Sequence, residues 1–316
     1  MDRQGRQIRR LGIGLAIGLL VGVAQAAEAP LHAMRWLAPG PGRARALGER
    51  PAECLKRPER QDVYGVEVGR AAFRTPLLLG GQAARAGLSC ETCHAGGRAN
   101  RNFQFPGVSG RPGTADLTTA LFSSRRSDGV DNPVPIPDLV GSQPSARAPH
   151  DPRGRALETF IQGHVTQAFD GAEPTPAVLA GLAAYVASLT PRACPKTPVE
   201  TLRAGAFVSD SRRAVAAARG ALRSGDHATA AFMASAARAP LGQLYERYDT
   251  PSLTADRASL RAADRDLAAL AEAARSGDPR TERLLNTWLG QSLAWGAQLE
   301  RDEPRSLFSR KRLAGL

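Results

Sequence analysis

Apolar residues recur at helical spacing along most of the second half of the chain. Four stretches rich in alanine and arginine carry this periodicity: residues 199–223, 228–248, 254–275 and 280–300. Turn-forming residues such as Gly225 and Gly277 separate them. Because short breaks favour neighbouring antiparallel helices, we expect residues 196–316 to form an α-helical bundle domain of about four helices, with Trp288 and Trp295 in its core.

The first half of the chain combines fewer helical stretches with a long irregular segment. Helices are predicted over residues 66–75, 155–164 and 176–189. Residues 96–145 are dense in Gly, Pro, Asn and Asp and lack helical periodicity. This pattern indicates a long loop that wraps around another group. We therefore expect an all-α fold, with an irregular lead-in over residues 27–50 and a domain with long Pro/Gly-rich loops over residues 51–195.

The N-terminal residues have the pattern of a targeting segment. Several arginines precede an apolar run over residues 11–23 that is too short to span a bilayer comfortably. Ala24-Gln25-Ala26 then matches a cleavage signal. We expect residues 1–26 to be a signal peptide for Sec-type export, cleaved near Ala26, which predicts a periplasmic protein. The alternative is a retained segment that anchors the chain in the membrane.

Composition and charge narrow the range of partners. Aromatic residues make up only 5% of the chain, which favours helices over sheets. The formal net charge is +12, carried mostly by single arginines on Ala-rich stretches, and no basic run has interleaved aromatics. This pattern argues against a nucleic-acid partner, while a basic surface attracts acidic proteins.

Cys90-Glu91-Thr92-Cys93-His94 is the most informative motif in the chain. Two thiols at this spacing can add to the two vinyl groups of one haem, and the adjacent imidazole can bind the iron as proximal ligand. A thioredoxin-like pair would follow a strand in a βαβ pattern, and a zinc site would need two further ligands in a compatible cluster. The sequence has neither, so the motif predicts one covalent haem c held by Cys90, Cys93 and His94.

Two cysteines remain once the haem motif is assigned. Cys54 and Cys194 flank the predicted haem domain, and disulfides persist in exported proteins. A disulfide between them would close a loop around the whole haem region, which the chain-entropy model values at roughly 4–5 kcal/mol. The alternatives are two separate thiols or a copper-binding pair.

Two stretches around the haem motif resemble the bacterial di-haem cytochrome c peroxidase family and its relatives. The first, over residues 69–94, is similar to the family's G-R-x-x-F-x-x-P-x-L ahead of S-C-x-x-C-H. The second, over residues 137–164, is similar to its P-x-L-x-G, A-P-x-x-H-D-G and L-E-E-A-I-x-x-M. The resemblance implies a cytochrome c-type haem domain like the family's C-terminal, electron-transfer half, in which Gly69 and Phe73 pack against Tyr185.

The chain also departs from that family. The family carries two haems, whereas this sequence has one C-x-x-C-H motif, and Pro152 replaces the glycine of H-D-G. The peroxide-binding half of the family has no counterpart here, and residues 196–316 lie outside the resemblance.

The sixth iron ligand has few candidates. No methionine lies between His94 and Leu189, so a methionine ligand from within the domain is excluded. His164 lies in a predicted helix at the position that holds the sixth ligand in the resembled family. His150 is the alternative, and Met34 could approach from the lead-in. An open sixth position would instead favour gas binding or peroxidase chemistry.

These observations support a periplasmic monohaem c-type cytochrome that passes single electrons to a redox partner protein. Two other functions stay open. One is a single-haem peroxidase or oxidase with an open distal site, in which His150 acts as acid and base. The other is a sensor or assembly module in which the haem reports redox state and residues 196–316 bind a partner.

Overall fold

The computed structural model describes residues 30–123, 125–141 and 155–316 and is mostly helical, as the periodicity predicts. The predicted signal peptide over residues 1–26 and the alternative ligand His150 lie outside this part of the chain. Within it, no helix is both long enough and apolar enough to cross a membrane.

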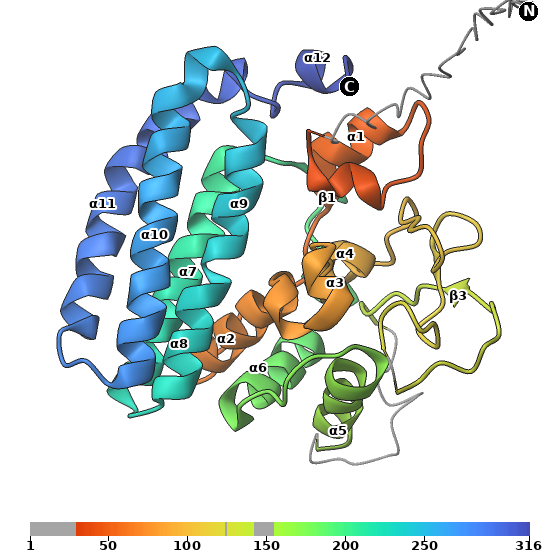
Figure 1. The fold of residues 1–316 in the computed structure, drawn as a ribbon, viewed down its shortest axis with the longest axis horizontal. Helices are drawn as coiled ribbons and strands as arrows, with labels where there is room; N and C mark the ends of the chain where they lie inside the picture. The colour runs from red at the N-terminus through yellow and green to blue at the C-terminus, as the bar shows by residue number, and fades with distance from the viewer. Residues whose placement is uncertain (1–29, 124, 142–154) are drawn as a thin grey trace, which may run out of the picture.

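The second half of the chain forms a helical bundle, as predicted (Figure 1). Its helices are α7 (Ala204–Arg223), α8 (His227–Ala236), α9 (Arg238–Arg247), α10 (Thr254–Ser276) and α11 (Thr281–Asp302). The prediction of a single helix over residues 228–248 is wrong, because this stretch forms two helices, α8 and α9, which meet at Ala237. Pro240 explains the division, since it has no N–H for a continuous helix and fits only the first turn of a new one. Short helices complete this half: η7 (Pro251–Leu253), η8 (Glu303–Arg305) and α12 (Arg310–Leu313).

Two helices of the first half cross closely. α2 (Val63–Arg74) packs against α6 (Pro176–Ala187), which begins with Thr175 as its N-cap and Pro176 at its first position. A Cβ atom added to Gly69 would lie 1.9 Å from the carbonyl oxygen of Gly181, so only glycine permits this approach. The Phe73 and Tyr185 rings lie 5.1 Å apart, which confirms their predicted packing.

Several short helices lie between α2 and α6 in the chain. They are η2 (Pro76–Leu78), α3 (Gly81–Arg85), α4 (Cys90–Cys93), η3 (Ala95–Gly97), α5 (Arg155–Gly163) and the π-helical turn η5 (His164–Ala168), with η6 (Pro191–Ala193) after α6. The long loop predicted over residues 96–145 is largely irregular where it is described. It contains one short strand pair, β2 (Thr114–Ala115) with β3 (Val134–Pro135), and a buried cluster that includes Phe103, Phe122 and Ile136.

The lead-in is more ordered than the sequence predicts. Residues 32–51 form η1 (His32–Arg35), α1 (Arg43–Gly48) and β1 (Glu49–Pro51). β1 pairs antiparallel with β4 (Val199–Thr201), so the helix predicted to begin at residue 199 begins only at Ala204. The lead-in is ordered because Leu31, Leu37 and Leu47 form a separate apolar cluster with Leu307 and Leu313 near the C-terminus.

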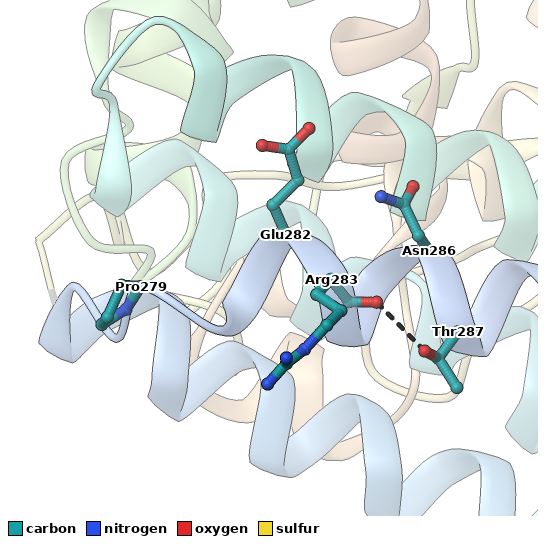
Figure 2. A pocket seen from close by; sticks show the side chains of 5 residues that line it. All are labelled: Pro279, Glu282, Arg283, Asn286 and Thr287. Carbon is teal, nitrogen blue, oxygen red and sulfur yellow. Dashed lines mark hydrogen bonds between the residues drawn. The ribbon is translucent and has the colours of Figure 1, made fainter.

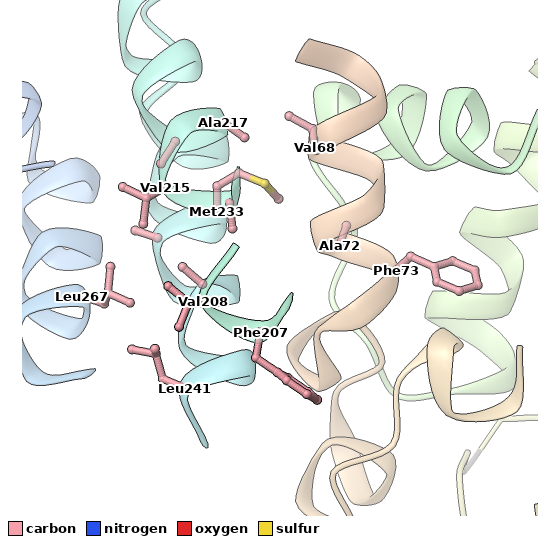
Figure 3. Close-up of a cluster of buried hydrophobic side chains, with 14 of the residues drawn as sticks. Val68, Ala72, Phe73, Phe207, Val208, Val215, Ala217, Met233, Leu241 and Leu267 are labelled. Carbon is pink, nitrogen blue, oxygen red and sulfur yellow. The ribbon is translucent and has the colours of Figure 1, made fainter. Parts of the chain in front are cut away.

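One apolar core continues across the predicted boundary at residue 195. It joins side chains of α2 and α6 to side chains of α7, α8, α10 and α11. Figure 3 shows Met233 of α8 pointing toward α2, where Val68 lies, while Phe73 points from α2 away from the bundle. The bundle therefore packs against α2 on the side opposite Phe73, and in this way it supports the segment that carries the cysteine motif.

Candidate functional site

The cysteine motif is fixed by local hydrogen bonds. Cys90 and Cys93 are the first and last residues of the one-turn helix α4, and the backbone N–H of His94 donates to the Cys90 carbonyl at 2.8 Å. Thr92 closes both ends of this turn. Its hydroxyl accepts from the Ser89 N–H at 3.0 Å, and its carbonyl accepts from the Asn100 side chain at 2.8 Å. The spacing of the motif thus places both thiols on one rigid turn.

The two thiols lie against apolar surroundings. Cys90 packs between the main core and the cluster around Phe103 and Phe122, and Cys93 packs against that second cluster. Burial raises the pKa of both thiols to about 12. A thioredoxin-like pair needs thiols with a lowered pKa, so this environment favours the haem interpretation of the motif over a redox dithiol.

His94 has a defined ring orientation. Its Nδ1 lies 3.0 Å from the carbonyl oxygen of Pro137, and its ring centroid lies 6.5 Å from that of Phe73. Burial lowers the pKa of His94 to about 4, with the nearby His164 acting in the same direction. The imidazole is therefore neutral at pH 7, and donation from Nδ1 to Pro137 leaves Nε2 as the nitrogen that could bind a metal.

His164 lies close enough to His94 to affect its pKa. It is the first residue of the π-helical turn η5, a type of distortion that is frequent at functional sites. Its Nδ1 lies 3.0 Å from the Phe160 carbonyl oxygen, and the Phe160 ring lies 4.3 Å from the imidazole. The structure thus places two of the sequence-predicted ligands near each other, with His94 directly after α4 and His164 at the start of η5.

The other described candidates for the sixth ligand lie elsewhere. Met34 packs in the apolar cluster of the lead-in, and Met233 is fully buried in the bundle. His32 contacts Glu246 of α9, and His227 is an exposed residue at the start of α8. This arrangement favours His164 over each of them.

A buried ion-pair network joins α2 to α7 next to α4, and it was not predicted from the sequence. On α2, Arg70 and Arg74 contact Glu53 at 2.9 and 3.0 Å and Asp210 of α7 at 2.9 and 2.6 Å. Tyr185 adds a 2.6 Å hydrogen bond to Glu53. The network reaches the motif, since Glu91 lies 3.8 Å from Arg74. The only sequence signal was the pair of arginines four residues apart on one helix face.

The disulfide predicted between Cys54 and Cys194 is present in the structure. The guanidinium of Arg98, which the sequence did not single out, lies 3.9 Å from Cys54 Sγ and 4.0 Å from Cys194 Sγ. Arg98 also pairs with Asp138 at 2.7 Å. The disulfide is thus linked through one side chain to the loop whose Pro137 holds His94.

The residues of the motif fit a covalent haem. Two thiols share one turn between apolar clusters, and the adjacent imidazole is oriented by a backbone carbonyl. No group of three or more His, Cys, Asp or Glu side chains within the described residues could hold a bare metal ion. A haem iron takes at most two ligands from protein side chains, so His94 and His164 would suffice to hold it.

Two cavities among the described residues, one beside α4 and one on α11, do not add ligands to this site. A cleft of about 410 Å³ lies beside α4 and is lined by Thr92, Arg74 and Arg247 among others, but not by Cys90, Cys93 or His94. Figure 2 shows a second hollow along the outer side of α11. Two of its polar side chains already have partners, since Glu282 accepts from Arg223 and Asn286 accepts from Arg219.

Comparison with protein-family models finds no match to this chain, and neither curated proteins nor solved structures match it. The resemblance to the di-haem cytochrome c peroxidase family therefore rests on the motif residues themselves.

Proposed function

We propose that this chain is a monohaem c-type cytochrome that transfers single electrons. The observation that carries the proposal is the C-x-x-C-H motif on one short turn, with its thiols against apolar clusters and the His94 ring oriented by Pro137. A haem bound there supplies a one-electron change at its iron. The same motif residues support an origin as the electron-transfer half of a di-haem peroxidase.

Each residue of the site has a role in this proposal. Cys90 and Cys93 form the thioether bonds, and His94 provides the proximal ligand. The Pro137 carbonyl holds the proximal ring and raises its basicity. His164 is the distal ligand, and ligation by two imidazoles lowers the reduction potential relative to histidine with methionine.

The proposal includes export to the periplasm. Residues 1–26 have the signal-peptide pattern, and the Cys54–Cys194 disulfide suits an oxidising compartment. The partner is a redox protein whose docking surface is acidic, because the chain keeps a net charge of +9 once residues 1–26, with four Arg and one Asp, are taken from its total of +12.

Covalent haem is tested on the full chain, produced in the periplasm of a host that matures c-type cytochromes. The denatured protein should retain its haem on a gel and stain for haem-dependent peroxidase activity. The double variant Cys90→Ala, Cys93→Ala should lose the stain. The matched control Cys54→Ser, Cys194→Ser, which removes the other two thiols, should keep it. Haem that extracts freely into acidic acetone would refute the proposal.

A further inference from the structure

One guanidinium contacts both sulfurs of the only disulfide in the described residues. Arg98 Nη1 lies 3.9 Å from Cys54 Sγ and 4.0 Å from Cys194 Sγ. The two cysteines differ in access to solvent, because Cys54 is 2% exposed whereas Cys194 is an exposed residue. The disulfide thus joins an exposed cysteine to a buried one, with a cation beside both sulfurs.

The backbone around this disulfide is held together without it. β1 and β4 pair on one side, and the Ala52 N–H donates to the Pro198 carbonyl at 2.9 Å. On the other side, the Lys56 N–H donates to Ser188 and the Thr190 N–H donates to Cys54, both at 2.9 Å. Opening the S–S bond therefore leaves these two segments paired, so the reduced protein can keep its fold.

We propose that Cys54–Cys194 is a thiol–disulfide exchange site whose substrate is an external thiolate. The thiolate attacks Sγ of the exposed residue Cys194 and forms a mixed disulfide with it. The Cys54–Cys194 bond breaks, and its electron pair leaves on Cys54 Sγ as a thiolate. A second external thiolate then attacks the sulfur of the first, so that Cys194 leaves as a thiolate and takes a proton from water. The two external thiols become one disulfide, and the cysteine pair gains two electrons.

Arg98 assists this reaction at the leaving sulfur. A neighbouring cation stabilises a thiolate, and a more stable leaving thiolate speeds exchange and favours the reduced pair at equilibrium. The ion pair with Asp138 at 2.7 Å holds the guanidinium in place. Because both side chains of that ion pair are about two-fifths exposed, solvent screens the effect, and we expect a moderate one.

The experiment uses the full-chain protein and reduced glutathione at pH 7, with quenching by iodoacetamide and peptide mass mapping. Glutathione should appear on Cys194 and the alkyl group on Cys54. Dithiothreitol serves as the dithiol probe: reduction completed by it but not by glutathione would mean that resolving the mixed disulfide needs a dithiol, and completion by glutathione would mean that a monothiol suffices. Mapping also separates this result from the haem proposal, because it reads Cys54 and Cys194 directly.

The variants test the role of Arg98. Arg98→Gln should slow the reaction with glutathione roughly three- to tenfold, whereas Arg98→Lys should keep most of the rate because it keeps the charge. The control Arg101→Gln removes an exposed charge from the same loop and should react like the wild type. The proposal is overturned if glutathione is found on Cys54, if only the unfolded protein reacts, or if Arg98→Gln and Arg101→Gln behave alike.

Discussion

The imidazole of His94 is held by the backbone of Pro137, with 3.0 Å between Nδ1 and the carbonyl oxygen. Because the acceptor is a main-chain atom, the loop over residues 134–138 fixes the ring, whatever side chains it carries. The other ring nitrogen, Nε2, is then the one available to the iron of the proposed haem. This contact explains how a motif on a four-residue helix can present an oriented ligand.

His164→Ala should convert the ferric haem from a low-spin to a high-spin spectrum, because it removes the proposed distal ligand. His164→Met should raise the reduction potential, since a thioether stabilises ferric iron less than imidazole does. Optical spectra and redox titration of the holoprotein measure both. The exposed His227→Ala serves as control and should leave the spin state unchanged, as should His150→Ala.

The opposite pattern would change the interpretation. A low-spin spectrum that survives His164→Ala but is lost in His150→Ala or Met34→Ala would assign the distal ligand to another residue. A wild-type ferric haem that is already high-spin and turns over peroxide quickly would indicate a peroxidase.

Gly69→Ala should lower the free energy of unfolding by an amount at the upper end of roughly 1–3 kcal/mol. The new methyl group would lie 1.9 Å from the Gly181 carbonyl oxygen, and backbone atoms cannot move aside as a flexible side chain can. Gly65→Ala on the same helix is the matched control, because its methyl group meets no atom within 4 Å. It should raise stability by roughly 0.5–1 kcal/mol through helix propensity. Equal denaturation midpoints for the two variants would contradict this account.

The crossing of α2 and α6 could be predicted, whereas the network beside it could not. A glycine and a phenylalanine one turn apart indicate a close helix contact from local sequence, and the family resemblance names the partner helix. Glu53 and Asp210 reach Arg74 from 21 and 136 residues away, and nothing in the local pattern selects them among the other acidic residues.

Parts of the candidate site could likewise be predicted, whereas others could not. The spacing of Cys90, Cys93 and His94 predicts a haem site, and the Cys54–Cys194 disulfide is predicted because these are the two cysteines that remain. The Pro137 carbonyl carries no sequence signal, since every residue has one. The pairing of β1 with β4 also escapes sequence analysis, because three-residue strands are too short for their alternation to be detected.

Removing the disulfide should destabilise the protein without abolishing its fold. For the Cys54→Ser, Cys194→Ser variant we expect a loss of roughly 4–5 kcal/mol, because the disulfide closes a loop spanning 140 residues. The far-UV circular dichroism at 25 °C should stay native, since β1 and β4 remain paired. An unfolded variant at 25 °C would argue that the backbone pairing is insufficient, and would also count against reversible exchange at this site.

Asp210→Asn should lower stability at pH 7 by roughly 3–5 kcal/mol, because it leaves buried guanidinium groups short of a partner. Asp210 accepts from Arg70 at 2.9 Å and from Arg74 at 2.6 Å. The control is Asp264→Asn, which breaks the more exposed pair with Arg238 and should cost less than about 1 kcal/mol. Urea denaturation measures the free energy of unfolding of both variants. Equal losses of stability would show that burial of the network adds nothing to the stability of the fold.

The same network predicts the acid sensitivity of the fold. Burial alone would raise the pKa of Glu53, but Arg74 and Arg70 lower it from 4.5 to about 2, and the pKa of Asp210 is likewise held below its usual range by Arg74 and Arg70. Because the folded-state pKa values are depressed, this stabilisation is complete above about pH 4.5 and is lost as the pH falls toward 2. In Asp210→Asn the free energy of unfolding should therefore fall less steeply over this window than in the wild type. Parallel pH profiles for the two proteins would mean that other carboxylates cause the acid unfolding.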